Sequence, residues 1–171
     1  MNMVLINDSE AAGDGSVVLS DRRYAHIVKV LKLKAGDSFR IGIRDGVTGT
    51  ARITAVTDSA VEAMCSFNEA KVDEVNIDIL LAMPRPKVMK RLWAPLAMLG
   101  VGRIFIINAE KVEKYYFDTH VLDEDFYTPL IVDGLEQACG TFMPRVSIAR
   151  AVTPESESFF IQFNGLSKVL A

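Results

Sequence analysis

In the first seventy residues, apolar and polar side chains alternate in short runs that are typical of β-strands. Apolar residues occupy every second position over 39–43 and again over 51–55, which is the period of a strand with one buried face. Two further apolar runs, 17–19 and 61–67, lie on either side of these segments. Short strands joined by glycine- and aspartate-containing turns at this spacing predict a small β-barrel or sandwich over residues 1–70.

A short helix is predicted inside this unit. Either Ser20 or Asp21 can cap its amino end, because both side chains accept hydrogen bonds from free N–H groups. Its apolar face follows at three- and four-residue spacing and consists of Tyr24, Ile27, Val28 and Leu31.

From about residue 74 the period changes, and apolar strands alternate with helices. The run over 75–83 ends in continuous apolar residues, as a strand covered on both faces does. Pro86 suits the first turn of a helix that ends before Gly100, and Pro95 inside that helix should kink it. The next predicted elements are a strand over 103–107, a helix over 126–139, a strand over 146–149, a helix over 155–163 and a strand beginning at Val169. This alternation predicts an open, mainly parallel α/β sheet over residues 74–171.

Composition narrows the class of protein. Half of the 171 residues are apolar and the mean hydropathy is +0.21, which excludes a disordered chain. No apolar run approaches the ~20 residues of a membrane helix, and the first residues lack the pattern of a signal peptide. The cysteines, Cys65 and Cys139, and the histidines, His26 and His120, are too scattered for a disulfide framework or a metal cluster. We therefore expect a cytoplasmic protein with no membrane segment and no metal ion.

The charge is unevenly distributed along the chain. The net charge of −3 argues against a nucleic-acid binder, but residues 22–52 hold eight basic residues against two acidic ones. Residues 85–103 hold five basic residues and no acidic one, whereas residues 110–136 hold eight acidic residues against two lysines. Because a polyanion responds to the local field, the two basic segments favour RNA binding; the alternative is an ordinary solvated surface. The candidate RNA-binding residues are Arg22, Arg23, His26, Lys29, Lys32, Lys34, Arg44, Arg85, Lys87 and Arg91.

The segment 84–91 joins the end of a predicted buried strand to a basic helix. In open α/β sheets ligands bind beyond the carboxyl ends of the strands, and the amino end of a helix favours anions. Arg85 and Lys87 add positive charge there, and we expect both to lie near the junction of the two halves of the chain. The alternative is a stiff turn with solvated charges. The sequence shows no complete catalytic constellation, no phosphate-binding loop and no glycine-rich dinucleotide motif.

Several short motifs keep a characteristic order and spacing over residues 20–150. They are His26 with Val30-Leu31-Lys32 and Gly36-Asp37, Leu81-Ala82-Met83-Pro84 with Lys87, Leu99-Gly100-Val101 with Ile104, and Leu135-Glu136-Gln137-Ala138 with Pro144 and Val146. The ordered set resembles the bacterial 16S ribosomal RNA uridine N3-methyltransferases. These are enzymes of the SPOUT superfamily, with a knotted α/β domain and an N-terminal PUA-like RNA-binding barrel.

The resemblance implies a PUA-like barrel over residues 1–70 and the first part of a SPOUT methyltransferase domain over residues 74–171. It implies transfer of a methyl group from S-adenosylmethionine to N3 of a uridine in 16S ribosomal RNA of the small ribosomal subunit. It also implies a homodimer and a cofactor pocket edged by Leu81, Met83 and Pro84. It assigns no catalytic residue.

The chain departs from the family pattern in several places. Lys32 stands where family members commonly have arginine, and the stretch before Gly100 differs from the usual Lys-x-x-Glu-Leu-Gly-Val. The Gly-Pro-Glu-Gly-Gly loop and the Leu-Gly-x-x-Ile-Leu-Arg segment, which form the knot and most of the cofactor pocket, do not occur. We therefore expect a divergent member without the complete active site. The alternatives are a non-catalytic RNA- or ribosome-binding protein that retains the barrel, and a small-molecule α/β enzyme.

Overall fold

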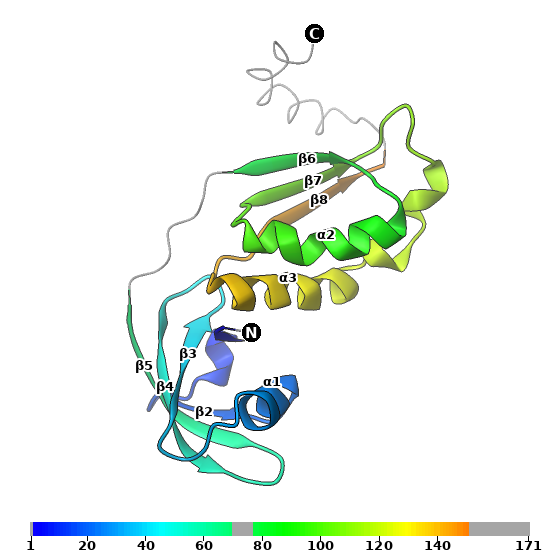
Figure 1. Ribbon diagram of the computed structural model, residues 1–171. Helices are drawn as coiled ribbons and strands as arrows, with labels where there is room; N and C mark the ends of the chain where they lie inside the picture. Colours follow the sequence, from blue (N-terminus) through cyan, green and yellow to red (C-terminus); the bar gives the residue numbers. More distant parts are fainter. Residues whose placement is uncertain (1, 70–76, 151–171) are drawn as a thin grey trace.

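The computed structural model describes residues 2–69 and 77–150, which form two β-sheets and a layer of helices. The first part of the chain builds a curled five-stranded sheet, and the second part builds a three-stranded parallel sheet (Figure 1). The helices α2 (Pro86–Met98) and α3 (Glu124–Ala138) lie on the face of the parallel sheet that is turned toward the curled sheet. The two sheets therefore lie at opposite ends, with α2 and α3 between them.

The curled sheet has the strand order β1-β3-β4-β5-β2. Its strands are β1 (Val4–Ile6), β2 (Ser16–Leu19), β3 (Ser38–Ile43), β4 (Thr48–Val56) and β5 (Val61–Glu69). β1 pairs in parallel with β3, and the other neighbours are antiparallel. A short 3-10 turn, η1 (Asp8–Glu10), follows β1. All five strands contribute side chains to one core, and Ile27 joins that core from outside the sheet.

The predicted alternation in this sheet is confirmed. Phe39 and Ile41 are buried, whereas Arg40 between them is exposed, and strands occupy the four predicted segments. The sequence did not predict β1, because its three residues are all buried and so do not alternate. The predicted small barrel or sandwich corresponds to one curled sheet, in which β1 and β2 are the two edges.

The predicted short helix is present but changes its pitch. It begins as α1 (Arg22–Ala25), which Asp21 caps by accepting a hydrogen bond from the N–H of Arg23, and continues as a π-helical turn, η2 (His26–Val30). Tyr24, Ile27 and Val28 pack in the core as predicted. Leu31 is 43% exposed, so its predicted place on the buried face is wrong. The wider π-helical turn rotates this residue away from the face that a 3.6-residue period assigns to it.

The parallel sheet has the strand order β6-β7-β8. The strands are β6 (Asp78–Ala82), β7 (Arg103–Ile107) and β8 (Arg145–Ala149), close to their predicted places. The central strand β7 is buried at its three middle residues, but Leu80 in β6 is 37% exposed. Among the described residues, β6 is an edge strand and both helices pack on one face of the sheet, so within them the predicted cover on both faces of β6 is not found. The predicted helix over 155–163 and strand at Val169 lie outside the described residues.

The helices α2 and α3 pack closely against each other. α2 begins at Pro86, as predicted, and continues through Pro95 to Met98. A Cβ atom at Gly134 of α3 would lie 2.3 Å from the carbonyl oxygen of Ala94, so this close approach requires glycine. The ring of Trp93 stacks on Tyr127 at 4.6 Å, and its Nε1–H donates to the carbonyl of Val121 at 3.0 Å. These contacts fix the position of α2 between the two sheets.

Candidate RNA-binding surface and cofactor edge

The first two predicted RNA-binding residues, Arg22 and Arg23, form ion pairs within the protein. Arg22 Nη1 lies 2.8 Å from Asp133 Oδ1 and 3.0 Å from Glu136 Oε2, both on α3. Arg23 Nη2 lies 2.6 Å from Glu10 Oε1 and 2.8 Å from Asp21 Oδ2, and its Nη1 donates to the carbonyl of Leu5 at 3.1 Å. Both arginines therefore contribute charge to ion pairs within the fold, Arg23 from a largely buried side chain and Arg22 from a side chain that is 50% exposed.

Glu136 connects the curled sheet to the helical layer. Its side chain is 1% exposed, and its Oε1 accepts a hydrogen bond from the N–H of Leu5 at 3.0 Å. Its backbone carbonyl accepts hydrogen bonds from the N–H groups of Asn2 and Met3. Together with the ion pair to Arg22, these contacts attach α3 to the first residues of the chain and to α1.

The remaining predicted residues of the first basic segment differ in how much they expose. The side chains of Lys29, Lys32 and Lys34, which we call the η2 lysines, are exposed on and just after the π-helical turn. In the described parts of the chain they have no acidic partner. His26 and Arg44 are half-buried, and His26 Nε2 and Arg44 Nε have no hydrogen-bond partner among the described residues. Among the predicted RNA-binding residues of this segment, the η2 lysines are therefore the exposed cations without an acidic partner in the described parts of the chain.

The second basic segment presents its charges along the outer face of α2. Arg85 caps the amino end of the helix and is exposed, and Lys87 and Arg91 are exposed one turn apart. Pro95 and Met98 continue this exposed line toward the carboxyl end of the helix. The opposite face is buried in the core through Met89, Trp93, Leu96 and Ala97. We call the exposed line formed by Lys87, Arg91, Pro95 and Met98 the α2 stripe.

The two ends of α2 lie in different surroundings. A groove of about 490 Å³ joins its carboxyl half to the curled-sheet part of the molecule, with Ala94 and Met98 on one side and Arg22 and His26 on the other. The amino end of α2 follows β6 and lies at the far end of the parallel sheet (Figure 1). The prediction that Arg85 and Lys87 lie near the junction of the two halves of the chain is therefore wrong. The physical reason is that a helix following a strand starts at the strand's carboxyl end, here the end remote from the curled sheet.

The carboxyl ends of the three parallel strands form the edge at which open α/β sheets bind ligands. Leu81 packs partly buried against the core, and the side chain of Met83 is 2% exposed. The N–H of Met83 donates to the carbonyl of Ile107 at 2.9 Å. Of the three predicted cofactor residues, Leu81 and Pro84 are partly exposed and Met83 is buried. Beside them, Asn108 Oδ1 is buried with no hydrogen-bond partner among the described residues. An unpaired acceptor at this edge fits a ligand that donates a hydroxyl or amino hydrogen.

A hollow of about 560 Å³ lies at the end of β8, on the same edge of the sheet. The short turns η3 (Lys114–Phe117) and η4 (His120–Leu122) border it, together with Ile148 and Arg150. Arg150 Nη1 lies 2.7 Å from Asp118 Oδ1, and this ion pair joins the end of β8 to the segment after η3.

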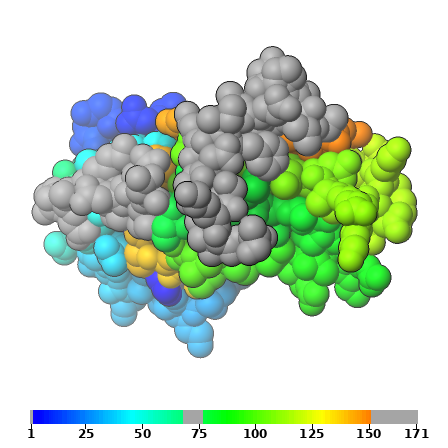
Figure 2. All heavy atoms as spheres, turned by 90° about the horizontal axis from the view of Figure 1, so that it is seen from above, coloured from blue at the N-terminus to red at the C-terminus, as the bar shows by residue number. Residues whose placement is uncertain are grey.

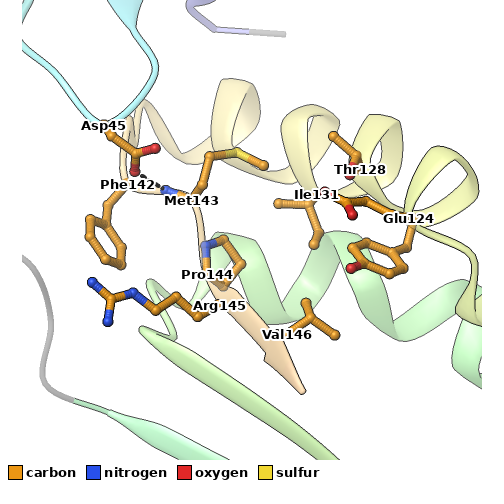
Figure 3. Close-up of a pocket in the computed structure, with 10 residues that line it drawn as sticks. Asp45, Glu124, Thr128, Ile131, Phe142, Met143, Pro144, Arg145 and Val146 are labelled. Carbon is orange, nitrogen blue, oxygen red and sulfur yellow. Dashed lines mark hydrogen bonds between the residues drawn. The ribbon is translucent and has the colours of Figure 1, made fainter. Parts of the chain in front are cut away.

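A second hollow, of about 580 Å³, lies at the opposite edge of the sheet, near the amino end of β8 (Figure 3). Asp45, from the β3–β4 turn, accepts a hydrogen bond from the N–H of Met143 at 2.8 Å and closes one side. Glu124 and Thr128 of α3 line the other side. This hollow is a junction between the curled sheet and the parallel sheet, with carboxylates on both sides, and it offers no excess of positive charge for RNA.

Reasoning from the sequence missed two residues of the carboxyl edge. Asn108 was overlooked because a single asparagine after a strand is an ordinary turn residue. Tyr115 was overlooked within an acidic segment, although two adjacent tyrosines there were a possible signal. Glu136 belonged to a family motif but had no structural role assigned. Its partners near the amino terminus are identified only by the fold.

Within the described residues, no helix is both long and apolar enough to cross a membrane. In the same residues, no group of three or more potential metal-ligating side chains of His, Cys, Asp or Glu lies close enough together to hold a metal ion.

Comparisons with known proteins match a family model in the first part of the chain and solved structures over most of its length. The family described as "RNA methyltransferase PUA domain" matches residues 19–63, which include η2 and most of the curled sheet. The structure of a ribosomal RNA small subunit methyltransferase E from Neisseria gonorrhoeae bound to S-adenosyl methionine is similar, with a TM-score of 0.64 and 20% identity. The match covers 87% of this chain and 62% of that chain. The fold is therefore that of an RNA methyltransferase with a separate curled-sheet unit.

Two relatives of higher sequence identity narrow the class. The chain is 30% identical to ribosomal RNA small subunit methyltransferase E 1 of Borreliella burgdorferi, over 99% of this chain and 70% of the relative. It is 32% identical to ribosomal RNA small subunit methyltransferase E of Treponema pallidum, over 89% of this chain and 58% of the relative. The chain belongs to the ribosomal RNA small subunit methyltransferase E family. It spans between about three fifths and seven tenths of the length of these relatives.

Proposed function

We propose that the protein transfers a methyl group from S-adenosylmethionine to N3 of a uridine in 16S ribosomal RNA of the small ribosomal subunit. The relatives from Treponema pallidum and Borreliella burgdorferi are named as small-subunit ribosomal RNA methyltransferases, and the similar structure from Neisseria gonorrhoeae is bound to S-adenosyl methionine. The observation that carries the proposal to this chain is the set of exposed cations on and after η2 and along α2, two elements that a groove between His26 and Met98 joins. We call this set the line of cations.

This line of cations matches the demands of a large folded RNA. The η2 lysines lie beside the curled sheet, and the groove between His26 and Met98 leads from there to the carboxyl end of the α2 stripe. Arg91 and Lys87 follow along the helix, and Arg85 lies at the carboxyl edge of the parallel sheet. Lysine and arginine contacts to phosphates fix the position and orientation of an RNA without reading its sequence. RNA held in this way spans both parts of the molecule.

The carboxyl edge of the parallel sheet is where the target base would enter. Uridine N3 is hidden in a paired or stacked base, so the base must be presented singly or flipped out. S-adenosylmethionine, when bound, supplies the methyl group. Pro84 and the unpaired acceptor Asn108 Oδ1 would hold one side of that cofactor, and the deeply buried Met83 would support the turn from below. These residues position the ligands, and we assign no proton-removing residue to the described parts of the chain.

The finer organisation follows from membership of the family. We propose that residues 1–70 form a PUA-like RNA-binding unit and that residues 74–171 form part of a SPOUT-type knotted domain. The curled sheet, the parallel sheet and the family match over residues 19–63 support this division. We also propose a homodimer that acts on small ribosomal subunits in the cytoplasm, as the family resemblance implies.

Deletion of the gene tests the proposed function directly. Mass spectrometry of nucleosides from 16S ribosomal RNA should show the loss of one N3-methyluridine, and the wild-type gene should restore it. Lys29→Gln combined with Lys32→Asn should restore less, and should flatten the dependence of log affinity for small subunits on log salt by ~0.7–0.9 per lost phosphate contact. Asparagine is chosen at position 32 because Lys32 has a φ of 57°, a left-handed conformation that asparagine tolerates.

Arg52→Gln is the matched control, because Arg52 is an exposed cation of the same basic segment on the curled sheet. It should restore the modified nucleoside fully. An unchanged level of N3-methyluridine after gene deletion would refute the proposed activity. Binding to small subunits without methyl transfer by the gene product would favour the non-catalytic alternative instead.

A further inference from the structure

Tyr115 exposes its ring at the carboxyl edge of the parallel sheet. Its relative exposure is 64%, and it is the one aromatic residue among the large hydrophobic side chains that the described part of the chain leaves exposed. A single exposed apolar side chain is common in proteins and by itself indicates nothing. The surroundings of this ring distinguish it from the other exposed apolar side chains.

The turn that carries Tyr115 is firmly attached to the core. Within η3, Phe117 is 3% exposed, and Tyr116 packs against the same core cluster. The guanidinium of Arg150 donates to the carbonyl of Phe117 and to Asp118, both at 2.7 Å. The ring of Tyr116 meets that of Tyr115 edge-on, with centroids 4.9 Å apart and an angle of 83° between the planes. The exposed ring is therefore held in place before any partner arrives.

Positive charge lies next to the ring. Arg85 lies at the start of α2, directly after β6, and η3 follows β7, so both lie beyond the carboxyl ends of neighbouring parallel strands. The interactions with Tyr116 raise the pKa of Tyr115; the charge of Glu113 adds to this rise and the charge of Arg85 opposes it. Lys114 is exposed beside Tyr115 in the same turn. Figure 2 shows the yellow-green segment that includes η3 at the end of the molecule opposite the curled sheet, next to the green segment that includes α2. The ring therefore lies where the line of cations ends.

We propose that Tyr115 is a stacking platform for an unpaired nucleotide of the RNA, with Arg85 holding the adjacent phosphate. This proposal rests on the proposed function and identifies where the single-stranded part of the substrate lies. A rigid exposed aromatic ring beside a guanidinium is the combination that single-stranded RNA recognises, because bases stack on the ring while the cation neutralises the backbone. Stacking is tolerant of base identity, so Tyr115 orients the strand and does not select the target.

The same features favour RNA over a protein partner. A protein interface of useful affinity needs a contiguous apolar patch with a central cluster of anchors. The immediate neighbours of Tyr115 in η3 are the cation Lys114 and the partly buried Tyr116, and Glu113 and Asp118 bracket the turn. One ring among charged side chains is too small an apolar surface for a stable protein contact, but it matches the size of one base.

The test compares three variants of the full chain on two RNA probes. The probes are a fluorescein-labelled single-stranded decamer of uridine and a hairpin duplex of similar length, and fluorescence anisotropy measures their affinities. Tyr115→Ala should weaken binding of the single strand about thirtyfold, the middle of the range for loss of one stacked base, and should leave the hairpin unchanged. Tyr115→Phe should bind the single strand like wild type, and Tyr115→Leu should bind it as weakly as Tyr115→Ala.

Salt dependence separates stacking from charge. Tyr115→Ala should keep the wild-type slope of log affinity against log salt, whereas Arg85→Gln should flatten it by ~0.7 for one phosphate contact on a single strand. Met64→Ala, which removes an exposed apolar side chain from the curled sheet, is the control and should change neither quantity.

Wild-type affinity of Tyr115→Ala for the single strand would overturn the proposal, as would equal weakening on both probes. Full affinity in Tyr115→Leu would also overturn it, because an apolar contact with a partner would then explain the exposed ring. These outcomes are independent of the gene-deletion experiment. Loss of N3-methyluridine together with a wild-type Tyr115→Ala affinity would leave the methyltransferase function standing and remove the stacking platform alone.

Discussion

The beginnings of α1 and α2 look alike in the sequence and differ in the structure. Each helix follows a strand, and each begins with two basic residues within its first few positions. At α1, Arg22 and Arg23 pair with four carboxylates, which lie in η1, at the helix cap and on α3. At α2, Arg85 and Lys87 have no acidic partner within the described residues.

The difference shows that a run of basic residues in the sequence does not measure the charge available to a ligand. The arginines of α1 form ion pairs with carboxylates that range from the buried Glu136 to the exposed Asp133, and the pairs to α3 attach the curled-sheet part to the helical layer. Among the described residues, Arg85 and the cations of the α2 stripe have no acidic partner, and α3 packs on the opposite face of that helix. We therefore expect substitutions at α1 to change stability and substitutions at α2 to change RNA affinity. Three predictions test this division, from the largest expected effect to the smallest.

The largest effect is expected at Glu136. Glu136→Ala removes the acceptor of the Leu5 N–H and the partner of Arg22 from a buried site. We expect the free energy of unfolding to fall by about 3 kcal/mol, because the buried N–H of Leu5 is left unpaired and the ion pair with the half-exposed Arg22 is lost. Chemical denaturation measures this change.

Asp133→Asn is the matched control for Glu136. Asp133 pairs with the same Arg22 but its side chain is 52% exposed. An exposed pair contributes little, so we expect a change of about 0.5 kcal/mol or less. Equal losses in the two variants would show that burial does not decide the contribution of these carboxylates and would break the comparison.

A smaller effect is expected at Arg23, and it depends on pH. Arg23→Gln should lower the free energy of unfolding by about 1–2 kcal/mol at neutral pH, because the side chain is largely buried and hydrogen-bonds to two carboxylates. Partial burial acts to raise the pKa of Glu10 and of Asp21. The hydrogen bonds and the charge of Arg23, with the N–H of Asn7 also donating to Glu10, together outweigh burial, so both pKa values lie below the ordinary 4.5 and 3.8.

A carboxylate with a lowered pKa in the folded state stabilises the fold above its unfolded pKa and loses this contribution as the pH falls through the folded value. The wild-type Tm should therefore fall as the pH is lowered from 5 toward and below about 4. The Tm of Arg23→Gln should fall less over the same interval, so that the two curves converge in acid. Parallel Tm curves from neutral pH to pH 3 would contradict the assignment of these ion pairs.

The smallest effect on stability is expected on the α2 stripe. Lys87→Gln combined with Arg91→Gln should change the free energy of unfolding by less than about 0.5 kcal/mol, because both side chains are exposed. The same variant should bind small subunits more weakly and flatten the salt dependence by ~0.7–0.9 per lost contact. Arg23→Gln should leave that slope unchanged. A flatter salt dependence in Arg23→Gln, together with a loss of stability in the double variant, would contradict the assignment of Arg23 to the fold and of Lys87 and Arg91 to RNA binding.

Much of the fold could be predicted from local pattern. The alternation over 39–43 predicted β3, Pro86 marked the first residue of α2, and the apolar run over 103–107 matched β7. The failures have physical causes in the surroundings of each segment. β1 is buried at every position and carries no period, and Leu31 follows a π-helical turn that a 3.6-residue period does not describe.

The candidate site was less predictable than the fold. The positive charge of the two basic segments and the motif around Pro84 could be predicted directly from the sequence. Which of the basic side chains are free of ion pairs within the protein could not. Arg23 is near its partners Glu10 and Asp21 in the sequence, and yet only the turn after β1 brings the first of these within 2.6 Å. Tyr115 lies in a segment whose composition is acidic, and its exposure beside Arg85 depends on how η3 folds back across the edge of the sheet.

The sequence by itself determined the two kinds of sheet, the start of α2 and the resemblance to a family of RNA methyltransferases. These depend on the identity and spacing of neighbouring residues, because strand and helix periods repeat over two to four positions. Only the tertiary structure decided which cations are free and how the two parts of the chain are joined. The hydrogen bond from Leu5 to Glu136 spans 131 residues, and the parallel pairing of β1 with β3 crosses more than thirty. Such contacts leave no local pattern, because their partners become neighbours only when the chain has folded.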